Sequence, residues 1–145
     1  MGVAMRRLVA LTALACLLTG PAFAGQTPPP PVQKSKYIPP VKGMATIEVI
    51  QGQPKRVGKD MVTVVKVRNT SSGSLNLLKI DEYWYDANLK IVGGSPYAHK
   101  KAPIQPGEIV EITLHTPWNA QMNRNHLLFR HANGEVTAKA VKAFK

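Results

Sequence analysis

The sequence has little cysteine, few acidic residues and no long apolar run beyond its first two dozen residues. Its one cysteine is Cys16, so a disulfide-stapled scaffold and a cysteine-ligated metal site are both excluded. Eight of the 145 residues are acidic and nineteen are lysine or arginine, which gives a formal net charge of +11. Such a charge favours anionic surroundings such as phospholipid headgroups, cell-wall polymers or nucleic acid. A basic surface that only maintains solubility is the alternative.

The first 24 residues have the pattern of a secretory signal peptide. Arg6 and Arg7 precede an apolar stretch at residues 8–18, and an Ala-x-Ala cleavage motif occupies residues 22–24. We therefore expect an exported, periplasmic or extracellular protein, with no cysteine and a charge of 11 − 2 = +9 after cleavage. Because the apolar stretch is short, no transmembrane helix is expected in the mature chain. A retained anchor and lipidation at Cys16 are the alternatives, although the residues before Cys16 match a lipobox poorly.

Residues 25–43 are rich in proline, with four in a row at residues 28–31 and two more at residues 39–40. Prolines in series favour an extended polyproline II spacer. We interpret this segment as a linker that sets the reach of the domain or docks a partner, with a disordered leader as the alternative. The folded domain is then expected at residues 44–145.

Beyond the linker, apolar and polar residues alternate in short segments, and no helical period is visible. Turn-forming residues recur at intervals of about 8–12 residues, which is typical of an antiparallel β-sandwich or barrel. Residues 51–59 are expected to form a loop, and Gly93, Gly94 and Pro96 to interrupt the strand pattern. The expected strands cover residues 44–50, 61–68, 75–86, 89–92, 108–116, 125–131 and 135–144, and residues 97–102 are expected to form an exposed edge segment.

The segment at residues 75–86 is expected to be the central strand. Alternate side chains of a strand point to opposite faces. Trp84 is therefore expected in the core, whereas Lys79, Tyr83 and Tyr85 are expected on the solvent face. The two tyrosines are an aromatic pair that can stack on sugars, bases or partner side chains. Rings that merely cover lysine stems or neighbouring strands are the alternative.

Three turns carry structural residues. Asp86 opens the turn after the central strand, where its carboxylate can accept backbone N–H groups. Pro106 presets the backbone for a turn that Gly107 completes. Asn133 and Gly134 form the strongest hairpin signal, because a type I′ turn needs positive φ at both positions.

Three motifs resemble those of the bacterial FxLYD-like domain family. They are Val-Lys-Val-Arg-Asn-Thr at residues 65–70, Glu-Tyr-Trp-Tyr-Asp at residues 82–86 and Pro-Gly-Glu at residues 106–108. Trp84 stands where the family motif has Leu, and Glu82 stands where it has Phe. The resemblance implies an immunoglobulin-like or fibronectin-III-like antiparallel sandwich of about seven strands, in a bacterial envelope protein without catalytic activity.

No metal site is expected. The histidines follow neither an H-x-H nor an H-E-x-x-H spacing, and those five residues apart on one strand would point to opposite faces. Adding Met122 makes only a thin case for copper. The four histidines outside the leader are His99, His115, His126 and His131.

No catalytic constellation is expected either, and no cofactor. Asp81 and Glu82 are adjacent on a strand and diverge, while Asp86 is engaged in its turn, so no carboxylate pair can face a substrate. The acids are expected to pair across strands with the abundant lysines and arginines.

The sequence therefore predicts a non-catalytic binding or accessory module of the cell envelope. Its partner is expected to be a protein or an anionic envelope polymer, and no nucleic-acid motif is present. Trp118, in an expected loop, lies either on a binding surface or in a plug at one end of the sandwich. A structural stalk without a ligand is the alternative function. The expected binding face comprises Lys66, Arg68, Lys79, Tyr83 and Tyr85, with Trp118 as a further candidate.

Overall fold

The computed structural model describes residues 36–145, and the secondary structure of this part is all β. The expected signal peptide and most of the expected linker lie outside the described residues. The eight strands are β1 (Ala45–Gln51), β2 (Lys55–Val57), β3 (Asp60–Asn69), β4 (Lys79–Tyr85), β5 (Ile91–Ala98), β6 (Ile109–Pro117), β7 (Arg124–His131) and β8 (Gly134–Ala140).

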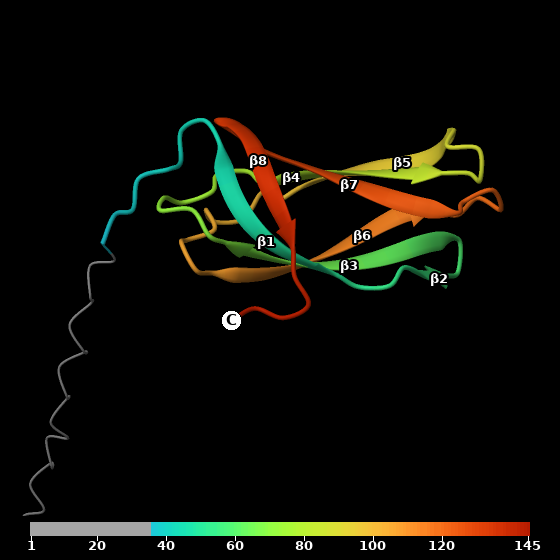
Figure 1. Cartoon of the computed structure of the whole chain (residues 1–145), viewed down its shortest axis with the longest axis horizontal. Coiled ribbons are helices and arrows are strands. Elements are labelled where there is room, and N and C mark those ends of the chain that lie inside the picture. Colours follow the sequence, from blue (N-terminus) through green and yellow to red (C-terminus); the bar gives the residue numbers. More distant parts are fainter. Residues whose placement is uncertain (1–35) are drawn as a thin grey trace, which may run out of the picture. The chain divides into compact units, whose positions relative to one another are not determined.

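The strands form one curled mixed sheet, a half-barrel (Figure 1). The strand order is β2-β3-β1-β8-β7-β4-β5, and β6 pairs with β3. β3 runs beside β6 along one edge, and its other edge meets β2 at the start and β1 at the end. The β1–β8 pair is parallel, and every other pair of neighbouring strands in residues 36–145 is antiparallel. The all-β prediction is therefore confirmed, and the eight strands compare with about seven expected. The parallel β1–β8 pair departs from the expected antiparallel arrangement.

The side chains that fill the interior follow the alternation of buried and exposed residues that the sequence predicts. In β6, for example, Ile112 and Leu114 are buried while Glu111 and Thr113 are exposed. Each large aliphatic side chain removed from water contributes about 1.5–3 kcal/mol. The apolar cluster, here called the apolar half, comprises Ala45, Ile47, Val49, Val65, Val67, Leu75, Leu78, Ile80, Ile104, Ile112, Leu114 and Phe129.

The central strand is shorter than expected, because β4 begins only at Lys79. Leu75 instead makes an isolated bridge to Ile104, and Leu77 has φ of 50°. A left-handed residue cannot continue a strand. Both Leu75 and Leu78 are nevertheless buried, although their opposite parity would place them on opposite faces of a strand. This segment therefore packs on the core without strand alternation.

β5 runs without a break through Gly93, Gly94 and Pro96, where the sequence predicted an interruption. Proline is tolerated because β5 is the last strand of the order, so one backbone edge needs no partner. A Cβ on Gly94 would lie 2.4 Å from the carbonyl oxygen of Glu82, so the glycine permits close strand approach. The expected loop at residues 51–59 also contains a short strand, β2.

The β7–β8 hairpin forms, but its turn is shifted by one residue. His131 pairs with Gly134, so the loop consists of Ala132 and Asn133. Gly134 has φ of 154°, whereas Asn133 is not among the positive-φ residues, so the expected type I′ turn is not adopted. Gly134 is required for another reason, because a Cβ there would lie 2.3 Å from the carbonyl oxygen of Gly43.

The end of the expected linker is attached to the domain. Pro40 forms a parallel bridge with Ser74, and the Val41 N–H donates to the Ser74 carbonyl at 2.9 Å. His131 Nε2 lies 2.7 Å from the Gly43 carbonyl oxygen. These contacts place the entry of the chain at the end of the half-barrel opposite the β2–β3 hairpin (Figure 1). Between residues 36 and 145, no helix is long and apolar enough to cross a membrane.

Candidate functional site

The structure separates the residues of the expected binding face. Lys66 and Arg68 lie on β3, whereas Tyr83 and Tyr85 lie on β4, and β1, β8 and β7 stand between these strands in the sheet order. Lys79 begins β4, at the far end of the strand from Tyr85. A single face that contains all five residues is therefore not formed.

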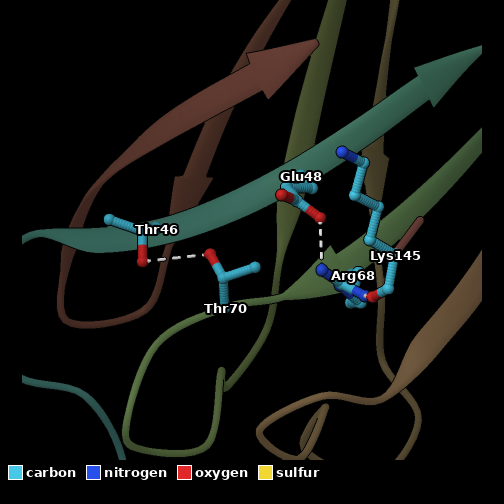
Figure 2. Close-up of polar contacts among 5 residues, drawn as sticks. All are labelled: Thr46, Glu48, Arg68, Thr70 and Lys145. Atoms are coloured by element: carbon cyan, nitrogen blue, oxygen red, sulfur yellow. Dashed lines mark hydrogen bonds and ion pairs between the residues drawn. The ribbon is translucent and has the colours of Figure 1, made fainter. Parts of the chain in front are cut away.

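Arg68 is engaged within the protein. Its Nη2 lies 2.6 Å from Glu48 Oε2, and Nη1 donates to the Lys145 carbonyl oxygen (Figure 2). The guanidinium also stands 5.5 Å from the centre of the Phe144 ring. These contacts attach the carboxy-terminal residues to β1 and β3, which gives Arg68 a structural role. Beside them, the Thr70 and Thr46 hydroxyls are 3.1 Å apart.

Trp118 and Arg56 form an aromatic–cationic pair at the opposite end from the chain entry. The Arg56 guanidinium carbon lies 3.7 Å from the centre of the Trp118 ring, within the range of a cation–π contact. The backbone N–H of Trp118 donates to the Lys59 carbonyl at 2.8 Å, which fixes the loop after β6 against the β2–β3 hairpin. Trp118 is 38% exposed, so the ring is presented at the surface while its orientation is held.

Three loops meet around this pair. The Asn119 side-chain amide donates to the Val92 carbonyl at 3.2 Å, and the Asn123 N–H donates to the Tyr85 carbonyl at 2.9 Å. The loop between β6 and β7 therefore contacts both the β2–β3 hairpin and the start of β5. We call residues 52–59, 85–91 and 118–124 the loop end, which lies at the right of Figure 1.

The loop end is strongly basic and unusually apolar at its surface. Its only acidic residue is Asp86, which accepts the N–H groups of Asn88 and Lys90 at 2.9 Å each. The loop end carries five exposed cations, namely Lys55, Arg56, Lys59, Lys90 and Arg124. Four of the exposed large apolar side chains also lie here, namely Val57, Leu89, Ile91 and Trp118.

Leu89 is the least expected of these apolar residues. It has φ of 67° and is 60% exposed, so it combines left-handed backbone with a side chain that lies largely in water. Glycine or asparagine normally occupies such a position, and a bulky residue there is strained. Strain of this kind is retained where it serves a function.

A hollow of about 530 Å³ adjoins the loop end. Its wall combines the Tyr85 ring, the Leu89 side chain, the Arg124 guanidinium and the His126 imidazole, with Asn125 beside them. No acidic side chain lines this hollow. Its cationic and hydrogen-bonding groups suit an anionic group such as a phosphate. Of the residues expected to bind a partner, Tyr85 and Trp118 lie at the loop end. Tyr83 lines a separate hollow on the β4–β5 surface.

Glu82 was expected to pair with a cation, and this expectation is wrong. The side chain is 1% exposed and points into the half-barrel with the parity of Ile80 and Trp84. Thr63 donates to Oε1 at 2.8 Å and Thr116 to Oε2 at 2.5 Å. The Asn125 amide adds a third donor at 2.8 Å. Both carboxylate oxygens of this buried side chain therefore have hydrogen-bond partners.

The cluster around Glu82 lies beneath the loop end and extends to the neighbouring strands. The Ser95 and Thr116 hydroxyls are 2.9 Å apart, and Gln51 donates to Asn125 at 2.9 Å. We call Thr63, Glu82, Ser95, Thr116 and Asn125 the polar half of the interior, and exposed Gln51 lies at its edge. The other expected cross-strand pairing is present on the outer surface, where Arg130 contacts Asp81. In residues 36–145, no group of three acidic, histidine or cysteine side chains is arranged to hold a metal.

No protein-family model and no curated protein matches the sequence. Among solved structures, the chain is similar to IrmA from Escherichia coli, at a TM-score of 0.49 and 8% sequence identity. That alignment covers 70% of this chain and 95% of IrmA.

Proposed function

We propose that this protein is a non-catalytic, exported binding module that attaches through its loop end to an anionic, phosphate-bearing lipid surface. The observation that carries the proposal is the convergence of five exposed cations and four exposed apolar side chains at one end of the domain. Cations are attracted to anionic lipid surfaces, and the attraction amounts to about 1 kcal/mol for each Lys or Arg near the surface.

The apolar side chains favour a lipid surface over a soluble polymer. A polymer of phosphates would be recognised by the cations alone, and Val57, Leu89 and Ile91 would remain exposed to water in such a complex. At a bilayer, the same side chains leave water for the interfacial region. Trp118 suits that depth because its ring is apolar and its indole N–H remains polar. Strained Leu89 at the tip of the β4–β5 turn is then explained as an inserted side chain.

We also propose that the domain is immunoglobulin-like and related to the FxLYD-like family. The connections that support this are the antiparallel β3–β6 and β4–β7 pairs and the β7–β8 hairpin, which match the B–E, C–F and F–G pairs of that fold. The turn at the Pro-Gly-Glu motif also supports the proposal. Pro106 and Gly107 occupy a turn closed by the Glu108 N–H on the Gln105 carbonyl at 3.0 Å, with φ of 79° at Gly107.

Vesicle binding tests the lipid proposal. The mature chain should co-sediment with phosphatidylglycerol vesicles and not with phosphatidylcholine vesicles, and the binding should weaken as salt rises. Replacing Lys55 and Lys59 with Gln should lower the partition coefficient about 30-fold, since each cation contributes about 1 kcal/mol. The matched control, Lys66→Gln with Lys79→Gln, removes the same charge from other surfaces and should bind within about threefold of wild type.

Tryptophan fluorescence locates the contact. The chain has two tryptophans, and Trp84 is 4% exposed, so a Trp84→Phe variant reports on Trp118 alone. Its emission should shift to the blue with phosphatidylglycerol vesicles. Equal loss of binding in both double variants would show a diffuse charge effect and refute the loop end. Binding to polyphosphate as tight as to vesicles, with no blue shift, would refute the lipid.

A further inference from the structure

The two strands of the last hairpin separate soon after their turn. β7 and β8 pair only at Arg130–Glu135 and His131–Gly134. β8 then runs parallel to β1 over five residue pairs, while β7 continues beside β4 (Figure 1). The edge of β7 from Arg124 to Phe129 that faces β8 therefore has no strand partner within the described part of the chain. Unpaired strand edges are templates for another strand.

A groove of about 210 Å³ occupies the space between the separated strands. Buried Val49 and Phe129 form part of its wall, and the Ala138 and Ala140 side chains of β8 are exposed along it. Along β7 the groove extends from Asn125, which accepts a hydrogen bond from Gln51, to Phe129. An extended peptide of about four or five residues matches this length, and alternate side chains would point into the groove.

The open edge of β7 lacks the features that protect the edge of the terminal strand β5. β5 carries Gly93, Gly94 and Pro96, and its pairing with β4 contains a register shift at Trp84 and Tyr85. Such irregularities discourage another strand from pairing. β7 reads Arg-Asn-His-Leu-Leu-Phe over the open stretch, without glycine or proline, and Leu128 is 43% exposed. This edge is suited to receiving a strand rather than to excluding one.

We propose that this groove binds an extended segment of a partner protein in which apolar residues alternate with acidic residues. The apolar side chains would enter the groove, and the main chain would pair with β7 by strand addition. The acidic side chains would face outward, toward exposed Lys139, which lies between Ala138 and Ala140 on β8, and exposed Lys142, which follows the strand. No acidic residue lines the groove itself. The groove shares Asn125 and His126 with the hollow beside the loop end, but its proposed partner does not depend on the lipid proposal.

A labelled octapeptide of alternating Val and Glu is the probe. Fluorescence anisotropy should show saturable binding, and amide exchange should slow at residues 124–129. Ala140→Trp, which fills the groove, should weaken binding at least tenfold, whereas Ala102→Trp, on the exposed loop between β5 and β6, should leave it unchanged. Lys139→Glu with Lys142→Glu should reverse the preference from the Val-Glu peptide to a Val-Lys peptide.

Several outcomes would refute the groove site. Peptide binding retained in Ala140→Trp would refute it, as would protection confined to β5. Weakened binding in the Lys55→Gln, Lys59→Gln variant would show that the peptide is attracted to the loop end instead. Concentration-dependent dimers with slowed exchange at residues 124–129, in the absence of peptide, would identify a second copy of the chain as the occupant.

Discussion

The two halves of the interior are held together in different ways. In the apolar half, apolar side chains from five strands and the adjoining loops pack against one another, and this half lies toward the chain entry. In the polar half, hydroxyl and amide groups converge on the carboxylate of Glu82, directly beneath the loop end. Ile80 and Glu82 show the contrast most clearly, because they are two residues apart on the same face of β4.

The comparison indicates what each half contributes. Apolar packing is non-directional and tolerates a partner of similar volume. A buried carboxylate requires donors at defined positions, so the polar half specifies how β3, β6 and β7 sit against β4. The hydrogen bonds to Glu82 also constrain the adjoining loop end, since Thr116 precedes Trp118 by two residues and Asn125 follows Arg124. We infer that Glu82 positions the strand ends from which the loop end is built.

The largest expected effect is in the apolar half. Ile80→Ala removes a fully buried side chain and leaves a cavity, so it should lower the free energy of unfolding by about 3 kcal/mol. Denaturant unfolding followed by circular dichroism measures this loss. The exchange of loop-end amides should remain as in wild type under native conditions. A selective loosening of the loop end by Ile80→Ala would break the distinction between the two halves.

Glu82→Gln should have the second largest effect. The amide retains the volume but places its own N–H group against a Thr hydroxyl, and about 1–3 kcal/mol of stability should be lost. In contrast to Ile80→Ala, this change should speed amide exchange in residues 118–124 more than in β1. An unchanged unfolding midpoint would show that the hydrogen bonds around Glu82 contribute nothing to stability.

Asp86→Ala should have a smaller effect confined to one turn. The carboxylate satisfies two backbone N–H groups, and its loss should cost about 1 kcal/mol. A decrease in the melting temperature of several degrees is expected. Asp86→Asn is the matched variant, since its side-chain oxygen can still accept both bonds, and it should recover most of the lost stability. Equal destabilisation by both variants would refute this assignment.

Leu89→Gly should have the smallest effect on folding, and in the opposite direction. Glycine relieves the left-handed backbone strain but adds freedom to the unfolded chain, so a net gain of about 0.5 kcal/mol is expected. Vesicle binding should weaken in the same variant because the inserted side chain is lost. A destabilised Leu89→Gly protein would show that this leucine is retained for folding and not for the surface.

The local sequence pattern was sufficient to predict the positions of several residues of the site, but not those of others. Trp84 and Glu82 share the inward parity of Ile80, and that parity alone was a signal that the carboxylate would be buried. Composition instead favoured a surface cation as the partner of Glu82, because lysine and arginine are abundant in the chain. The pairing of Trp118 with Arg56 had no local signal, since the two residues are 62 positions apart in the sequence.

The sequence by itself determined the all-β character of the described domain, the inward face of each long strand and the excess of basic charge, because alternation and composition are local properties. Only the tertiary structure decided which strands became neighbours. The parallel β1–β8 pair, the gap that it leaves beside β7 and the donors around Glu82 all depend on contacts between distant segments. Parity determines the face to which a side chain points, whereas the partner on that face depends on the register and curvature of the whole sheet.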